Sequence, residues 1–114
     1  MTKITLSLPP SDNHCYGQRG KIRFLYKEAR DWREQAQWAV KSQYKGKIQK
    51  GDVKIGKIIF FLKVKRDIQG SLKLIFDSFE GIVYENDRQV SEFGAVKKRI
   101  DKENPRVEIF IQEL

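Results

Sequence analysis

The sequence predicts an α+β domain in which two helices cover one face of a mixed β-sheet. Two observations favour this class: amphipathic helical periods interrupt the strand-like segments, and the order along the chain is strand, long loop, helix, strand, helix, strand, strand. At 114 residues and 39% hydrophobic residues, the chain has the size and composition of one folded domain. We therefore expect a single domain over residues 1–114.

The first third of the chain predicts a strand, a loop and a helix. Residues 3–8 alternate apolar with polar side chains, as a half-buried strand does, and Pro9-Pro10 ends the pattern. Residues 11–20 are rich in polar and turn-forming types and predict a loop, after which residues 21–25 form a short extended segment. Residues 27–44 then predict a helix. Its apolar residues recur at three- and four-residue steps: Ala29, Trp32, Ala36, Ala39 and Val40.

The middle of the chain predicts a central strand followed by a short helix. Residues 55–65 contain a continuous run of β-forming residues. Residues 71–80 predict a helix with Ser71 as its N-cap and Gly81 just after its end. The apolar face of this helix comprises Leu72, Ile75, Phe76 and Phe79.

The last two predicted strands complete the sheet. Residues 89–99 read as a strand with an irregularity at Gly94, and residues 106–112 alternate in the pattern of a closing strand.

The charge balance favours a polyanionic partner. Lys and Arg number 23 against 15 Asp and Glu, which gives a net charge of +8, so nucleic acid is the first candidate. The alternative is that the basic balance only keeps the protein in solution. One cysteine, Cys15, excludes an internal disulfide, and with one histidine a Cys/His zinc site is excluded too. Without a signal-peptide pattern or a membrane-length apolar run, we expect a cytoplasmic protein with no membrane contact.

A candidate metal site lies between the central strand and the strand at residues 89–99. Asp67 follows the first strand and Asp87 opens the second. The helix at 71–80 is about 15 Å long, and the six residues after it reach about 20 Å, so Asp87 is expected to return close to Asp67 at one end of the sheet. Paired carboxylates at that point need a cation, and hard oxygen ligands select Mg²⁺, with Mn²⁺ as a possible substitute.

Lys73 is the candidate phosphate ligand beside those acids. A carboxylate-bound metal with a nearby ammonium suits phosphodiester hydrolysis, and Lys73 is expected in the first turn of its helix, where anions are favoured. The alternative is that Lys73 forms an ordinary ion pair with Asp77 four residues later on a solvated face. The sequence leaves these two interpretations open.

The same segment resembles the RusA family of Holliday junction resolvases. The opening Leu8-Pro9-Pro10-Ser11-Asp12-Asn13-His14 resembles the start of that family, so the likeness covers nearly the whole chain. The residues that match the core motif are Asp67, Gly70, Lys73, Asp77, Gly81, Asp87, Gln89 and Val90.

The resemblance implies a homodimeric, Mg²⁺-dependent endodeoxyribonuclease, without an organic cofactor, that resolves four-way DNA junctions in recombination and repair. It implies that Asp67, Lys73 and Asp87 are catalytic and that Arg66 contacts the scissile backbone. Asp67 and Asp87 would bind the metal, together with the amide oxygen of Gln69.

Two departures from the family motif leave the activity open. Gln69 and Asn86 stand where the family has acids, and the loss of charge at Gln69 should weaken cation binding. The alternative function is therefore an impaired or inactive protein that binds branched DNA without cutting it. A third possibility is an RNA-binding α+β domain. Arg19, Lys21 and Arg23 lie in a basic stretch interleaved with aromatic residues and are predicted to contact the DNA backbone.

Overall fold

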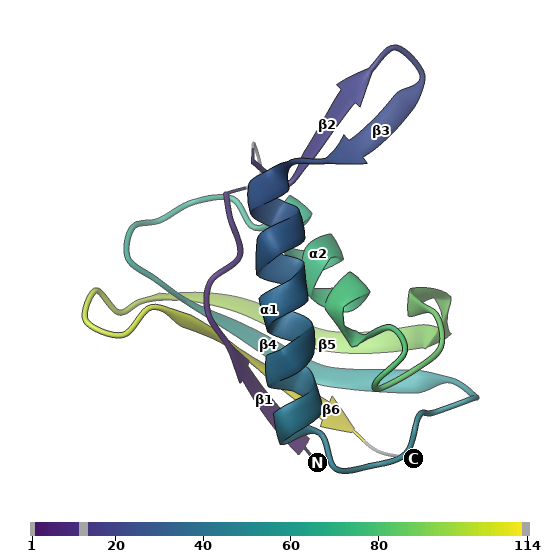
Figure 1. Cartoon of the computed structure of the whole chain (residues 1–114). Coiled ribbons are helices and arrows are strands. Elements are labelled where there is room, and N and C mark those ends of the chain that lie inside the picture. The colour runs from purple at the N-terminus through teal and green to yellow at the C-terminus, as the bar shows by residue number, and fades with distance from the viewer. Residues whose placement is uncertain (1, 12–13, 113–114) are drawn as a thin grey trace.

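The computed structural model describes residues 2–11 and 14–112. Asp12 and Asn13 of the family-like opening segment lie outside this part. Within it, the elements in chain order are β1 (Thr2–Leu6), β2 (Tyr16–Arg19), β3 (Ile22–Leu25), α1 (Lys27–Gln43), β4 (Val53–Leu62), α2 (Gln69–Phe79), the 3-10 helix η2 (Asp87–Gln89), β5 (Val90–Ile100) and β6 (Arg106–Gln112) (Figure 1).

The main sheet is mixed. Among the described residues it has four strands in the order β1-β6-β4-β5. Strand β6 is antiparallel to β1 and β4, while β4 runs parallel to β5. Helix α2 connects the two parallel strands, and both α1 and α2 lie on one face of the sheet (Figure 1). The predicted α+β class, with a mixed sheet and helices on one face, is confirmed.

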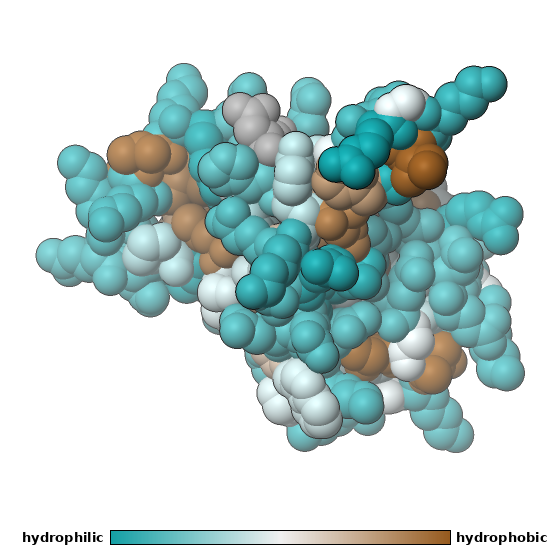
Figure 2. Space-filling model, turned by 45° about the horizontal axis from the view of Figure 1, so that its top comes forward, coloured by the Kyte–Doolittle hydropathy of each residue, from teal (hydrophilic) through white to brown (hydrophobic). Residues whose placement is uncertain are grey.

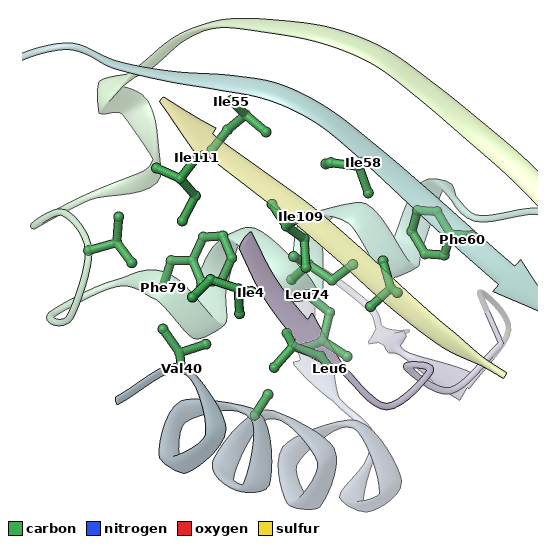
Figure 3. Close-up of a cluster of buried hydrophobic side chains, with 14 of the residues drawn as sticks. Ile4, Leu6, Val40, Ile55, Ile58, Phe60, Leu74, Phe79, Ile109 and Ile111 are labelled. Atoms are coloured by element: carbon green, nitrogen blue, oxygen red, sulfur yellow. The ribbon is translucent and has the colours of Figure 1, made fainter. Parts of the chain in front are cut away.

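The core lies between this sheet face and the two helices (Figure 3). Apolar side chains at alternate positions of β4 and β6 point into it, because successive residues of a strand face opposite sides. Trp32 of α1 is buried among them, as the sequence predicted. Fully buried residues of the cluster include Ile4, Val40, Ile55, Ile58, Phe60, Leu74, Phe79 and Ile109.

Helix α2 begins earlier than the sequence predicted. It starts at Gln69, with Ile68 at the N-cap, so the expectation that Ser71 caps the helix is wrong. Ser71 is fully buried, and its hydroxyl donates to the carbonyl oxygen of Pro10 at 3.2 Å. Lys73 therefore lies one turn into the helix and not in its first turn. The predicted end is confirmed, since Gly81 follows the C-cap with φ of 81°.

Strands β2 and β3 form a hairpin where a loop was predicted for residues 11–20. They pair in antiparallel register around the turn at Gly20, whose φ is 62°, and the hairpin projects from the body of the protein (Figure 1). Its base is joined to the start of α1 by the hydrogen bond from the Tyr26 N–H to the Cys15 carbonyl oxygen, 3.2 Å long. Because most of its side chains are exposed, the hairpin lacks the apolar alternation that identifies a half-buried strand.

Strand β5 shows its irregularity near its start. Its pairing with β4 shifts register between Val90 and Glu92, which corrects the expectation of an irregularity at Gly94. Gly94 instead marks a close approach of the two strands, because a Cβ there would overlap the carbonyl oxygen of Gly56. No helix in the described part of the chain has the length and apolar character that a membrane crossing requires.

Candidate active site

Lys73 lies between two carboxylates. Its Nζ is 2.9 Å from Oδ1 of Asp77 and 3.0 Å from Oδ2 of Asp87. Helix α2 places Lys73 and Asp77 one turn apart on the same face, while Asp87 enters from the start of η2. The ion pair with Asp77 that the sequence offered as one interpretation of Lys73 is therefore present, and Lys73 also lies beside Asp87.

The two carboxylates keep Lys73 charged. Burial alone would lower the pKa of the ammonium group, but the hydrogen bonds to Asp77 and Asp87 outweigh that effect and raise the pKa above its ordinary value. About half of the Lys73 side chain remains exposed. A positively charged group therefore faces solvent beside the two acids at neutral pH.

Tyr16 of the hairpin also binds Asp77. Its hydroxyl donates to Oδ2 of Asp77 at 2.8 Å, and the Arg23 guanidinium lies 4.7 Å from the centre of its ring. Burial, and then the hydrogen bond to Asp77, raise the pKa of Tyr16 above its ordinary value, so the hydroxyl stays a donor at neutral pH. The sequence analysis assigned Tyr16 no part in the site, because 61 positions separate it from Asp77.

Three acids converge on this region. One carboxylate oxygen of each of Asp77, Glu80 and Asp87 lies within 4.8 Å of the others. Oε1 of Glu80 accepts a hydrogen bond from the Asp87 backbone N–H at 3.2 Å, so Glu80 also fixes the start of η2. Carboxylate oxygens at such spacing fit a hard divalent cation. No pattern in the sequence indicates that Glu80 belongs to the site.

The turn that carries Asp87 is held by a reciprocal cap. The side-chain oxygen of Asn86 accepts from the Arg88 backbone N–H at 2.9 Å, and Oε1 of Gln89 accepts from the Asn86 backbone N–H, also at 2.9 Å. Nε2 of Gln89 donates to the carbonyl oxygens of Gln49 and Gly51, each at 2.8 Å. Gln89 therefore ties the turn to the segment that precedes β4. Asn86 is a capping residue here, and an amide serves that purpose as well as an acid.

Asp67 and Gln69 lie at the other end of α2. Both are exposed, and Asp67 is not a member of the acidic group found among the described residues. In the parallel pair, Val53 at the start of β4 lies opposite Val90 at the start of β5. Asp87 therefore precedes one end of the strand pair, whereas Asp67 follows the other. The strand arrangement does not support the expected meeting of these two acids at one end of the sheet.

Arg66 packs against the N-terminal segment. Its Nη2 donates to the Pro9 carbonyl oxygen at 2.7 Å, and its own carbonyl oxygen accepts from Lys98. Its Nε is buried and has no hydrogen-bond partner among the described residues. The guanidinium borders a cavity of about 520 Å³ that Glu28 and Asp31 also line.

The predicted DNA-binding cations lie on the hairpin. Arg19, Lys21 and Arg23 are all exposed, as is Ile22 near the tip. The face seen in Figure 2 is mostly hydrophilic, with separate hydrophobic patches. On the side facing α2, Arg23 lines a cavity of about 270 Å³ together with Lys73 and Asp77.

A comparison with protein families identifies the family to which the chain belongs. The family model described as endodeoxyribonuclease RusA matches residues 7–112. The chain belongs to the RusA family. No match was found among curated proteins. RusA enzymes are Holliday junction-resolving endonucleases that bind branched DNA and depend on divalent metal ions, and the resemblance seen in the sequence is therefore confirmed.

Proposed function

We propose that this RusA protein is a Mg²⁺-dependent endonuclease that cuts four-way DNA junctions. The observation that carries the proposal is the Lys73 ammonium group, held 2.9 Å from Asp77 and 3.0 Å from Asp87. A fixed cation beside clustered carboxylates suits phosphodiester cleavage. This reaction needs positive charge at the scissile phosphate and carboxylate oxygens that activate the attacking water, directly or through a metal ion.

Lys73 would bind the scissile phosphate. An ammonium group has three donors, and the two carboxylates use two of them. The exposed half of the side chain leaves the third donor accessible to a phosphate oxygen. Asp77 orients Lys73 in this scheme, because both of its carboxylate oxygens already accept hydrogen bonds from Tyr16 and Lys73.

Asp87 would be a ligand of the divalent cation. The family resemblance adds Asp67 and Gln69 as ligands, although both lie at the other end of α2 from Asp87. The geometry favours Glu80, whose carboxylate neighbours that of Asp87. Mg²⁺, or Mn²⁺ in its place, would polarise a phosphoryl oxygen and lower the pKa of an attacking water when bound. Cation binding by Asp67→Asn and Glu80→Gln, measured by calorimetry, identifies the second ligand. Loss in the first variant supports the resemblance, and loss in the second supports the acidic group.

The hairpin and Arg66 would contact DNA. Arg19, Lys21 and Arg23 present exposed positive charge on the hairpin, and Arg23 lines the cavity beside Lys73. We assign Arg66 to the phosphate backbone on the strength of the family resemblance. Neutralising the three hairpin cations together should weaken junction binding and flatten its salt dependence, with a slope change of about 0.9 per lost phosphate contact. An unchanged affinity and slope would remove the hairpin from the DNA interface.

A homodimer is proposed because two-fold cleavage of a two-fold junction needs two sites.

Cleavage of a labelled four-way junction tests the proposal. With Mg²⁺ or Mn²⁺ we expect paired nicks in strands of like polarity, little cleavage of linear duplex of the same sequence, and loss of cleavage in Lys73→Met and Asp87→Asn. Absence of cleavage by the unmodified protein at every metal concentration would contradict it. We also propose a cytoplasmic location, because a sequence with one cysteine does not rely on internal disulfides.

The alternative is a protein that binds junctions without cutting them. The amide at Gln69 favours it, because a neutral ligand lowers cation affinity. Gln69 is exposed at the first position of α2, where an acid is compatible with the helix dipole, so Gln69→Asp should fold normally. Gain of cleavage in that variant, from an inactive parent, would establish the alternative and its cause.

A further inference from the structure

We propose that Tyr16 is a positioning residue, which acts through Asp77 to hold Lys73 in the orientation that cleavage requires. The inference rests on the proposed function, since it assigns Lys73 a role in the reaction. It links the hairpin, which lies beside the site, to a helix residue 61 positions away.

The contacts of Asp77 supply the first argument. Its Oδ2 accepts from the Tyr16 hydroxyl at 2.8 Å and its Oδ1 accepts from Lys73 at 2.9 Å. A carboxylate held at both oxygens cannot turn about its terminal bond without breaking one of these hydrogen bonds. Only 17% of the Asp77 side chain is exposed, so these two hydrogen bonds are largely shielded from bulk solvent. The Tyr16 hydroxyl therefore helps to fix the direction of the Lys73 ammonium through Asp77, alongside the hydrogen bond from Lys73 to Asp87.

The surroundings of Tyr16 supply the second argument. The ring is covered by the Arg23 guanidinium at 4.7 Å, so the ring has its own anchor on the hairpin. Seven residues line one cavity of about 270 Å³: Tyr16, Arg23, Phe24, Leu25, Arg33, Lys73 and Asp77. Three of them are cations and the acid is already paired, so the polar part of the cavity suits a phosphate of the bound strand. Tyr16 forms the part of the cavity wall that contacts Asp77.

Removing the hydroxyl separates orientation from binding. Tyr16→Phe keeps the ring under Arg23 and leaves every cation of the cavity in place, but Oδ2 of Asp77 loses its donor. Lys73 then samples more directions, and the cleavage step slows. The exposed cations that attract DNA are unchanged, so junction affinity should be unchanged as well.

The experiment is single-turnover cleavage of a labelled junction at saturating protein, with junction affinity measured separately in Ca²⁺. For Tyr16→Phe we expect a cleavage rate lower by roughly tenfold and a Kd within about twofold of the parent. Tyr26→Phe is the matched control. It removes a hydroxyl near the base of the same hairpin that makes no hydrogen bond within residues 2–11 and 14–112, and it should alter neither quantity.

A double-mutant cycle with Asp77→Asn tests the route. If Tyr16 acts through Asp77, Tyr16→Phe should have almost no further effect on the rate once Asp77 has been changed. Full additivity of the two effects, a parental rate in Tyr16→Phe, or a weakened Kd at an unchanged saturating rate would each overturn the inference.

Failure of the proposed function gives a different result. If the unmodified protein does not cleave, the nuclease proposal fails. Equilibrium unfolding of the parent, the two single variants and the double variant still measures the coupling between Tyr16 and Asp77. Coupled effects of Tyr16→Phe and Asp77→Asn on the free energy of unfolding would then show a purely structural contact, and the positioning role would be overturned together with the reaction it serves.

Discussion

Replacement of Gln89 by alanine should loosen the turn that carries Asp87. The Gln89 side chain makes four hydrogen bonds. Oε1 accepts from the backbone N–H groups of Glu85 and Asn86, each at 2.9 Å, and Nε2 donates to the carbonyl oxygens of Gln49 and Gly51, each at 2.8 Å. Two segments that are distant in the sequence are joined in this way, so the loss affects both.

The magnitude follows from the number and exposure of these bonds. A neutral hydrogen bond contributes about 0.5–1.5 kcal/mol net to the free energy of unfolding. Four such bonds set an upper range of about 2–6 kcal/mol, but Glu85 and Gly51 are exposed and water will solvate the groups left behind. We therefore expect Gln89→Ala to lower the free energy of unfolding by roughly 2 kcal/mol.

Equilibrium denaturation in urea measures this effect, and calorimetric titration with Mg²⁺ measures its consequence for Asp87. Gln35→Ala is the control, because Gln35 is exposed on α1 and its loss should change stability by less than about 0.5 kcal/mol. A Gln89→Ala variant as stable as this control, with unaltered cation affinity, would refute the reasoning that Gln89 positions the turn.

Three further variants test other features. Gly94→Ala should lower the free energy of unfolding by about 1–3 kcal/mol, because the new Cβ meets the Gly56 carbonyl oxygen, whereas Gly51→Ala, which has open space around it, serves as the control in the same denaturation series. Asn86→Ala should cost about 1 kcal/mol and Asn86→Asp almost nothing, and equal losses in both would contradict the capping role. The neutral Tyr16 hydroxyl stabilises the fold below its unfolded pKa of about 10, and that stability is lost as the pH rises through the raised folded pKa. Urea midpoints at pH 9 and 11 should therefore fall less for Tyr16→Phe than for the parent.

The elements with strong periodicity were predictable from the sequence. Helix α1 and the strands β4 and β6 follow the apolar spacing closely, because each buries one face against a single core. The start of α2 was not predictable in the same way. Ser71 resembles a cap, yet it is drawn into the interior by the Pro10 carbonyl oxygen, and that contact depends on a segment 61 positions away.

In the candidate site too, the features set by local spacing were predictable and those set by long-range contacts were not. The pairing of Lys73 with Asp77 follows from helical spacing and was foreseen, as was the approach of Asp87 to the region of Lys73. The parts played by Tyr16 and Glu80 were missed, because they depend on how the hairpin and the turn after α2 fold back on the helix. The relative placement of Asp67 and Asp87 depends on the strand pairing of β4 and β5, which no local pattern encodes.

The cap at Asn86 has a consequence for how related sequences should be compared. The position requires a side-chain oxygen that accepts from the Arg88 N–H, and Asp, Asn, Ser and Thr all provide one. Relatives should therefore exchange freely among these four residues without loss of the turn. Gln89 is different, because its amide accepts at one end and donates at the other, and glutamate reproduces only half of that pattern. An Asn at position 86 should consequently not be counted as a lost acid, whereas a change at position 89 would disturb the turn itself.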